Sequence, residues 1–319
     1  MKQHFVALLI ILTFLQCKEA TVVKQPVKLR TRIDAVMSPS DLRNFAVEID
    51  SNYRHYNFKN IQDFKSITST TNYCKDLADS AGVSKPFIKE DFDNNGYTDL
   101  IAMSKYENQD FNVFVVYSYG KEQFQIKPIS RGSLGNCIYP KLKYIDGLPA
   151  LTMFTLQENT LFKKINKQDL LFKYGGFIEY NSHPTAHNIE SIRVDFSPCY
   201  GRCPIFEISI DEDLRARYVA TEFNYKNNLN SLEDVKGEFE GKISPQTFKE
   251  ICGLLNYIDF SSLKENYMVY HTDAPSIDLE IKYDNGQTKK ISDYGRVGTY
   301  GLIRLYDIFS ELRFTQNWK

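Results

Sequence analysis

The chain has few of the residues, and none of the motifs, that identify an enzyme from its sequence. It holds 5 histidines, 6 cysteines and 1 tryptophan among 319 residues. The motifs Gly-x-Ser-x-Gly, His-Glu-x-x-His and a glycine-rich phosphate loop are absent. These motifs supply a nucleophile, a catalytic metal and a nucleotide site respectively. The sequence therefore presents none of these catalytic devices at a recognisable spacing.

The chain also lacks an excess of charge of either sign. Its 39 lysines and arginines nearly balance its 40 aspartates and glutamates, for a net charge of −1. Nucleic-acid binding depends on a basic surface, so we expect no nucleic-acid partner. The length favours two domains, and the 21 tyrosines and 22 phenylalanines favour β structure.

A long apolar run occurs at the N-terminus, over residues 5–15 after the basic start Met1-Lys2-Gln3-His4. It has the length of a secretory signal and is too short to cross a hydrocarbon core of roughly 30 Å. The run ends at Phe14-Leu15-Gln16-Cys17, which resembles the lipobox of bacterial lipoproteins. The resemblance implies that residues 1–16 are removed, that Cys17 is acylated, and that the protein is exported and anchored to the outer membrane, on its periplasmic or surface face.

The residues after the lipobox give one further resemblance. Lys18-Glu19 is similar to the surface-export signal of some lipoproteins of the Bacteroidetes. Residues 17–39, which begin with the predicted lipidation site Cys17, are predicted to form a tether.

Residues 40–182 are predicted to form a β-rich α+β domain. Ser38-Pro39-Ser40-Asp41 has the pattern of a helix start, and Leu42, Phe45, Ala46 and Ile49 follow at helical spacing. A second short helix is expected over residues 74–81. Strands are expected over residues 100–103, 111–119, 124–129, 148–156 and 170–180.

An Asp-rich stretch lies between the second helix and the first of these strands. Asp91, Asp93, Asn95 and Asp99 place side-chain oxygens at alternate positions, Gly96 permits a sharp turn, and the Tyr97 carbonyl follows. Hard cations prefer such a set of oxygen ligands, so calcium is the candidate ion. The stretch resembles one calcium loop of the FG-GAP and VCBS repeats. The alternative is a hairpin turn rich in Asp and Asn that binds no metal.

Residues 188–319 are predicted to form a second α+β domain. The expected order is β-β-β-α-β-β-α, with helices on one face of an antiparallel sheet. Ser244-Pro245 opens one helix, residues 302–312 form the other, and Asp284-Asn285-Gly286 is a hairpin turn. The predicted fold class is therefore α+β with two domains, each an antiparallel sheet carrying a few helices.

Two stretches of the second domain carry a family resemblance. They are Cys199-Tyr200-Gly201-Arg202-Cys203-Pro204 and Tyr270-His271-Thr272-Asp273-Ala274-Pro275. They resemble a family of lipoprotein domains of unknown function found mainly in the Bacteroidetes, family six-four-three-eight. The resemblance implies a fold and a compartment, but no activity.

Cys199 and Cys203 allow three interpretations. An oxidising compartment favours a structural disulfide, for which Gly201 supplies backbone freedom. The alternatives are a redox pair and a zinc site completed by His183 and His187. Cys74 and Cys137 are candidates for a second disulfide, and Cys252 is expected in the core.

These features favour a non-catalytic, envelope-anchored lipoprotein with a binding or structural role and an unknown protein or glycan partner. The alternative is an extracytoplasmic hydrolase that uses the loop of His271 and Asp273 as acid–base groups, with calcium as a structural ion. The simplest competing interpretation of that loop is a polar connection before a strand.

Overall fold

The computed structural model describes residues 29–60, 62, 73–106, 110–130, 137–157, 164–225 and 233–319. The predicted signal peptide, Cys17 and most of the predicted tether lie outside these residues. No helix in the described ranges is long and apolar enough to cross a membrane.

The described chain begins with helices that cover one face of a sheet. These are α1 (Arg32–Ala35), α2 (Pro39–Ile49) and the 3₁₀ turn η1 (Ser51–His55). The predicted start of α2 is confirmed: the Ser38 hydroxyl accepts the Asp41 N–H, and the Asp41 carboxylate accepts the Ser38 N–H.

The sheet beneath them has five strands. They are β1 (Tyr56–Asn57), β2 (Phe87–Glu90), β3 (Asp99–Tyr106), β4 (Asp110–Ser118) and β5 (Phe124–Pro128), in the order β1-β3-β4-β5 with β2 also paired to β3. Alternate residues of a strand face opposite sides. Leu100 and Ala102 therefore pack towards α1 and α2, whereas Ile101 and Met103 pack into a second core.

The second core is shared with α4 (Tyr73–Ala81) and a four-stranded sheet. The strands are β6 (Ile138–Ile145), β7 (Leu148–Gln157), β8 (Lys164–Lys173) and β9 (Gly176–Glu179). The prediction of one strand over residues 170–180 is wrong. Tyr174 and Gly175 both have positive φ, so the chain reverses there into the β8–β9 hairpin.

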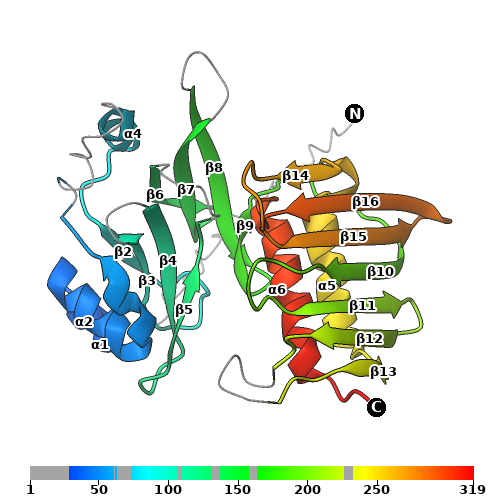
Figure 1. The fold of residues 1–319 in the computed structure, drawn as a ribbon. Coiled ribbons are helices and arrows are strands. Elements are labelled where there is room, and N and C mark those ends of the chain that lie inside the picture. The colour runs from blue at the N-terminus through cyan, green and yellow to red at the C-terminus, as the bar shows by residue number, and fades with distance from the viewer. Residues whose placement is uncertain are drawn as a thin grey trace, which may run out of the picture.

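The C-terminal part is a seven-stranded sheet with two helices on one face (Figure 1). Its elements are β10 (Ile189–Phe196), β11 (Ile205–Asp211), β12 (Arg215–Glu222), β13 (Gly237–Lys242), α5 (Pro245–Tyr257), η2 (Phe260–Ser262), β14 (Asn266–Met268), β15 (Ser276–Tyr283), β16 (Gln287–Tyr294) and α6 (Tyr300–Thr315). The strand order is β13-β12-β11-β10-β15-β16-β14.

The predicted α+β class is thus confirmed. The predicted order of elements along the chain, however, omits the two strands at the edges of the sheet, β13 and β14. β13 contains two glycines, and β14 has three residues and pairs in parallel with β16. Neither strand shows the apolar–polar alternation that identifies a half-buried strand.

The two parts of the chain meet at α6, next to β9 in Figure 1. The Glu179 carboxylate accepts the N–H groups of Tyr300 and Gly301 at the helix N-terminus. Tyr300 is buried in the core of the first part, and Ile178 in the core of the second. The residues on either side of the predicted domain boundary therefore share apolar contacts and a helix cap.

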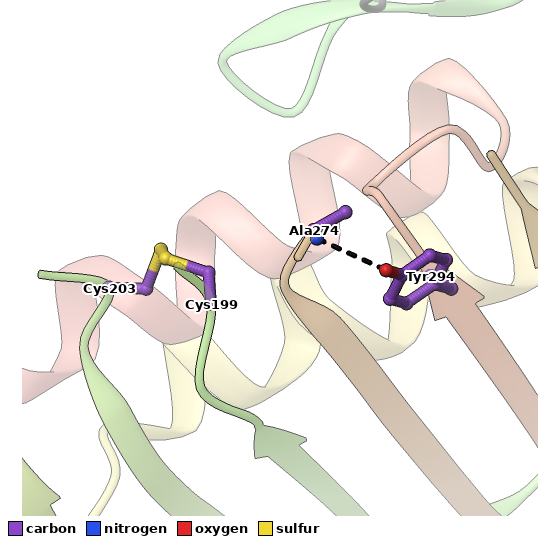
Figure 2. Close-up of a disulfide and its surroundings, with 4 residues drawn as sticks. All are labelled: Cys199, Cys203, Ala274 and Tyr294. Atoms are coloured by element: carbon purple, nitrogen blue, oxygen red, sulfur yellow. Dashed lines mark hydrogen bonds between the residues drawn. A yellow bond between two sulfur atoms is a disulfide. The ribbon is translucent and has the colours of Figure 1, made fainter. Parts of the chain in front are cut away.

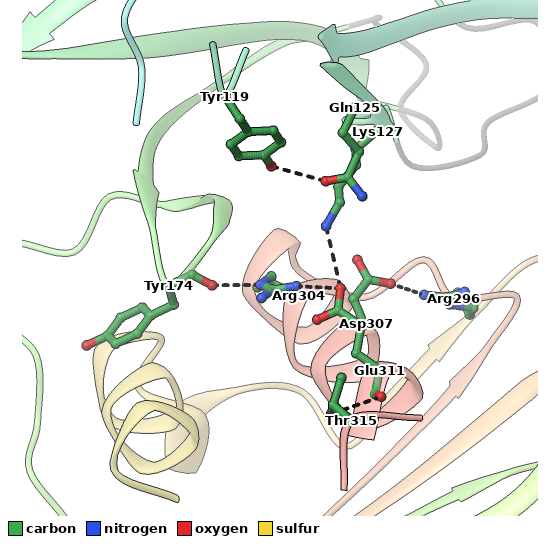
Figure 3. A network of polar contacts seen from close by, with 9 residues as sticks. All are labelled: Tyr119, Gln125, Lys127, Tyr174, Arg296, Arg304, Asp307, Glu311 and Thr315. Atoms are coloured by element: carbon green, nitrogen blue, oxygen red, sulfur yellow. Dashed lines mark hydrogen bonds and ion pairs between the residues drawn. The ribbon is translucent and has the colours of Figure 1, made fainter. Parts of the chain in front are cut away.

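A polar seam continues along α6 (Figure 3). Glu311 lies 3.5 Å from Lys127 of β5 and 3.4 Å from Arg304. Arg304 also donates to the Tyr174 carbonyl oxygen over 2.6 Å. The seam links the five-stranded sheet and the β8–β9 turn to the same helix.

Candidate functional site

The disulfide between Cys199 and Cys203 closes the connection from β10 to β11 (Figure 2). The two Cα atoms lie 5.7 Å apart, and Gly201 has φ 137°, which other residues rarely adopt. The predicted disulfide is confirmed. Because both sulfurs are bonded to each other and His187 Nδ1 pairs with Asp284 Oδ2, the zinc alternative is wrong.

The second stretch with a family resemblance lies directly beside this turn. The Tyr200 N–H donates to the Asp273 carbonyl oxygen over 3.0 Å, and the Ser197 N–H donates to the Ser276 carbonyl oxygen over 2.9 Å. The loop itself is held by the Tyr294 hydroxyl, which accepts the Ala274 N–H over 3.2 Å (Figure 2). The turn and the loop therefore form one continuous surface at the end of the sheet.

His271 and Asp273 are both exposed on this loop. The Asp273 carboxylate accepts the Thr272 hydroxyl, and in the described part of the chain no hydrogen bond joins it to His271. Asp273 has φ 69° and acts through its backbone as the partner of Tyr200. The arrangement fits a turn better than a preorganised acid–base pair.

A groove of about 1050 Å³ opens beside the turn and the loop. Its walls come from both parts of the chain, with β1, β3 and β4 on one side and the seven-stranded sheet on the other. We call it the tyrosine groove, after Tyr56, Tyr106, Tyr200 and Tyr270, which line it together with Met268, His271 and Asp273.

The aromatic side chains of this groove are unusually open to solvent. Tyr200 is 88% exposed and Tyr270 is 83% exposed. The disulfide and the bond to the Asp273 carbonyl oxygen hold Tyr200 in place, and the residue before Tyr270, Val269, donates its N–H to the Tyr294 carbonyl oxygen. Sequence reasoning missed these tyrosines as binding residues. The available clue in the sequence was a tyrosine inside each of two polar, turn-like stretches, residues 199–204 and 270–275.

The structure brings together three of the predicted metal ligands. Ligand oxygens of Asp91, Asp93 and Asp99 lie within 4.8 Å of one another. Asn95 is engaged differently, because its Oδ1 accepts the Tyr97 N–H and its Nδ2 donates to the Ser118 carbonyl oxygen. The loop thus presents three convergent carboxylates, a donor set that suits a hard cation.

Burial makes the negative charge of this cluster unfavourable. It raises the pKa of the fully buried Asp99 to about 7 and also raises the pKa of Asp93. Backbone N–H groups offset part of this cost: the Asp99 carboxylate accepts the N–H groups of Phe92 and Ser118. A cation bound at the cluster would offset the remaining cost of burying this negative charge.

The fold and the groove define an α+β domain in which a disulfide-closed turn and its neighbouring loop border a solvent-open aromatic surface. Residues 190–313, which contain both stretches, are a domain of unknown function (DUF6438), as the match to that family's model shows. This confirms one part of the resemblance, that the second half of the sequence contains a domain of unknown function. No curated protein and no solved structure matches the chain. The two disulfides fit a protein of an oxidising, extracytoplasmic compartment.

Proposed function

We propose that the protein is an outer-membrane lipoprotein of the Bacteroidetes type that binds a partner non-catalytically through the tyrosine groove. The observation that carries the proposal is the exposure of Tyr200 and Tyr270 on a disulfide-closed surface. Contiguous exposed aromatic groups on a soluble surface mark interaction sites. Rigid anchors also lose little conformational entropy when they bind.

A protein partner fits the groove better than a glycan does. Tyrosine and methionine are enriched in the centre of protein interfaces, whereas lysine, glutamate and aspartate are depleted there. Asp273 is the one lining residue of the groove with a full charge. A glycan partner is the other outcome of the test below.

The first prediction concerns the two exposed tyrosines. In capture from native membranes by the immobilised full chain, Tyr200→Ala combined with Tyr270→Ala is expected to reduce partner retention at least tenfold. Interface hot spots cost about 2 kcal/mol or more when truncated. The melting temperature should stay the same, because neither side chain is packed in a core.

Tyr144→Ala is the matched control, since it removes another exposed tyrosine from the four-stranded sheet. The control should retain the partner. Equal loss with Tyr144→Ala, or full retention by the double variant, would contradict the groove assignment. Partner release by glycosidase treatment would identify a glycan.

Hydrolysis with His271 and Asp273 is the second candidate function, favoured by one observation: both residues line the same open groove. The two functions differ in their response to His271→Ala. This change would abolish hydrolysis but would leave binding through the tyrosines in place.

The proposal includes a calcium ion held by Asp91, Asp93 and Asp99. The support is the convergence of three carboxylates around a buried position. Cation binding to the folded state alone raises stability, by about 2.7 kcal/mol when the free ion is at 100 times the Kd. The ion would fix the turn that leads into β3, the strand whose last residue, Tyr106, lines the tyrosine groove.

The second prediction follows from the charge of this cluster. In chelator, the melting temperature should fall as the pH rises from about 5.5 to about 8. The folded-state pKa of Asp99 is raised above its unfolded value, so stability is lost while the folded carboxyl deprotonates. Calcium binds the deprotonated form, so it should raise the melting temperature more at pH 8 than at pH 5.5.

Asp93→Asn should remove most of the calcium effect, and calorimetry on the full chain should show the lost binding. Asp213→Asn is the matched control, because Asp213 is an exposed aspartate in the β11–β12 turn. Identical melting curves in calcium and in chelator would contradict calcium binding and would show that the Asp-rich stretch is a turn that binds no metal.

A further inference from the structure

A buried arginine that has no acidic partner in the described ranges lies near the C-terminal end of α6. Arg313 is only 9% exposed, and among the described residues no carboxylate forms an ion pair with it. Its guanidinium donates to the Ser310 carbonyl and hydroxyl oxygens and to Asn224 Oδ1, over 2.9 to 3.1 Å. Three of its five N–H groups are used in this way, so two have no partner among the described residues.

Burial of this charge is costly, and its surroundings offset the cost only in part. The guanidinium carbon lies 4.5 Å from the centre of the Phe206 ring and 4.7 Å from that of Phe314. Desolvation still lowers the pKa of Arg313 to about 10. An anion would supply the opposite charge that this position lacks.

A second unsatisfied group lies in the same place. Tyr218 of β12 is 2% exposed, and its hydroxyl has no hydrogen-bond partner among the described residues. A buried hydroxyl without a partner destabilises the fold, because it has lost the hydrogen bonds that it makes with water in the unfolded chain. Tyr218 and Arg313 both line one pocket of about 620 Å³.

The rest of this pocket, which we call the Arg313 pocket, is aromatic, and its rim carries charges of both signs. The Phe239 ring stacks on Tyr218 at 5.7 Å, and the Trp318 ring lies 5.2 Å from it. Glu233, Asp234 and Lys236 lie at the rim. The Asp234 carboxylate accepts the N–H groups of Phe223 and Asn224 and lies 3.5 Å from Lys236.

These charges select the class of ligand. The rim has two acidic residues, Glu233 and Asp234, and one basic residue, Lys236. Its excess negative charge would repel a multiply charged anion such as phosphate. A single carboxylate in the pocket would meet a wall that contains both Arg313 and Tyr218, and an apolar body would pack on Trp318 and Phe239. Arginine recognises carboxylates through pairs of parallel N–H donors.

We propose that the Arg313 pocket binds a small organic monocarboxylate whose apolar part packs against Trp318 and whose carboxylate accepts hydrogen bonds from Arg313 and Tyr218. This site is separate from the tyrosine groove and does not depend on the function proposed for that groove.

The chain provides its own reporter for this site, because Trp318 is its 1 tryptophan. The third prediction is that phenylacetate produces a saturable change in the tryptophan fluorescence of the purified full chain, while phenylacetamide does not. The amide has the same shape and ring but carries no charge. A response to both compounds alike, to neither, or to inorganic phosphate in place of phenylacetate would overturn the proposal.

Tyr218→Phe tests the polar contact without disturbing the core. The removed hydroxyl has no hydrogen-bond partner in the described part of the fold, so the melting temperature should remain equal or rise. Affinity for phenylacetate should fall at least fivefold. Tyr306→Phe is the matched control, because it removes another buried hydroxyl that has no partner among the described residues and lies outside the pocket. Equal phenylacetate affinity in the two variants would overturn the assignment of the hydroxyl to the site.

Discussion

Replacing both Cys74 and Cys137 by serine is expected to lower the free energy of unfolding by about 4 kcal/mol. The structure confirms this second predicted disulfide, which joins α4 to the residue before β6. The two cysteines are 63 residues apart, and the loop between them contains most of the five-stranded sheet. A crosslink across so long a loop restricts the unfolded chain strongly.

The loss should appear as a fall of roughly 10 °C in the melting temperature of the full chain. The Cys199→Ser/Cys203→Ser variant is the matched comparison, because it also removes one disulfide. Its cysteines are only 4 residues apart, so the expected loss is about 2 kcal/mol. An equal loss in both variants would contradict the dependence on loop length.

Peptide mapping under non-reducing conditions provides the chemical check. Two disulfide-linked peptide pairs are expected, with Cys252 as a free thiol. Burial raises the pKa of the Cys252 thiol to about 11, so this thiol should react slowly in the native protein. Rapid labelling of Cys74 or Cys137 in the native protein would show that their disulfide is absent.

Cys17→Ser is expected to move the protein from the membrane fraction to the soluble fraction. The apolar run of residues 5–15 ends at this cysteine, and the resemblance to a lipobox implies two or three acyl chains on it. More than one chain is needed for stable anchoring.

Membrane fractionation with an alkaline wash measures this effect, and Cys252→Ser is the matched control. Cys252 lies within α5, partly packed against the core, so its removal should leave the protein with the membranes. If Cys17→Ser still sediments after the wash, the anchor lies elsewhere.

The sequence alone determined the features that depend on a few neighbouring residues. The capping box at Ser38 fixed the start of α2, and Ser244 did the same for α5, where its hydroxyl accepts the Thr247 N–H. The run Asp284-Asn285-Gly286 marked the β15–β16 hairpin, where all three residues have positive φ. Backbone sterics and local hydrogen bonds act over such short spans, so the chain carries this information in its order.

Other features needed contacts that no local pattern records. The edge strands β13 and β14 are held by their neighbours rather than by their own alternation, and the N-terminus of α6 is capped by Glu179, which lies 121 residues before Tyr300.

Both candidate binding surfaces were decided by the tertiary structure. The tyrosine groove joins residues of β1 and β3 to loops of the seven-stranded sheet, and the Arg313 pocket joins α6 to β12 and the C-terminus. The sequence shows a tyrosine or an arginine at each position, but not whether it is packed in a core or open to solvent. Burial depends on which distant segments pack together. That packing leaves Tyr200 in solvent and Arg313 buried beside Asn224, with no counter-ion in the part of the chain that the structure describes.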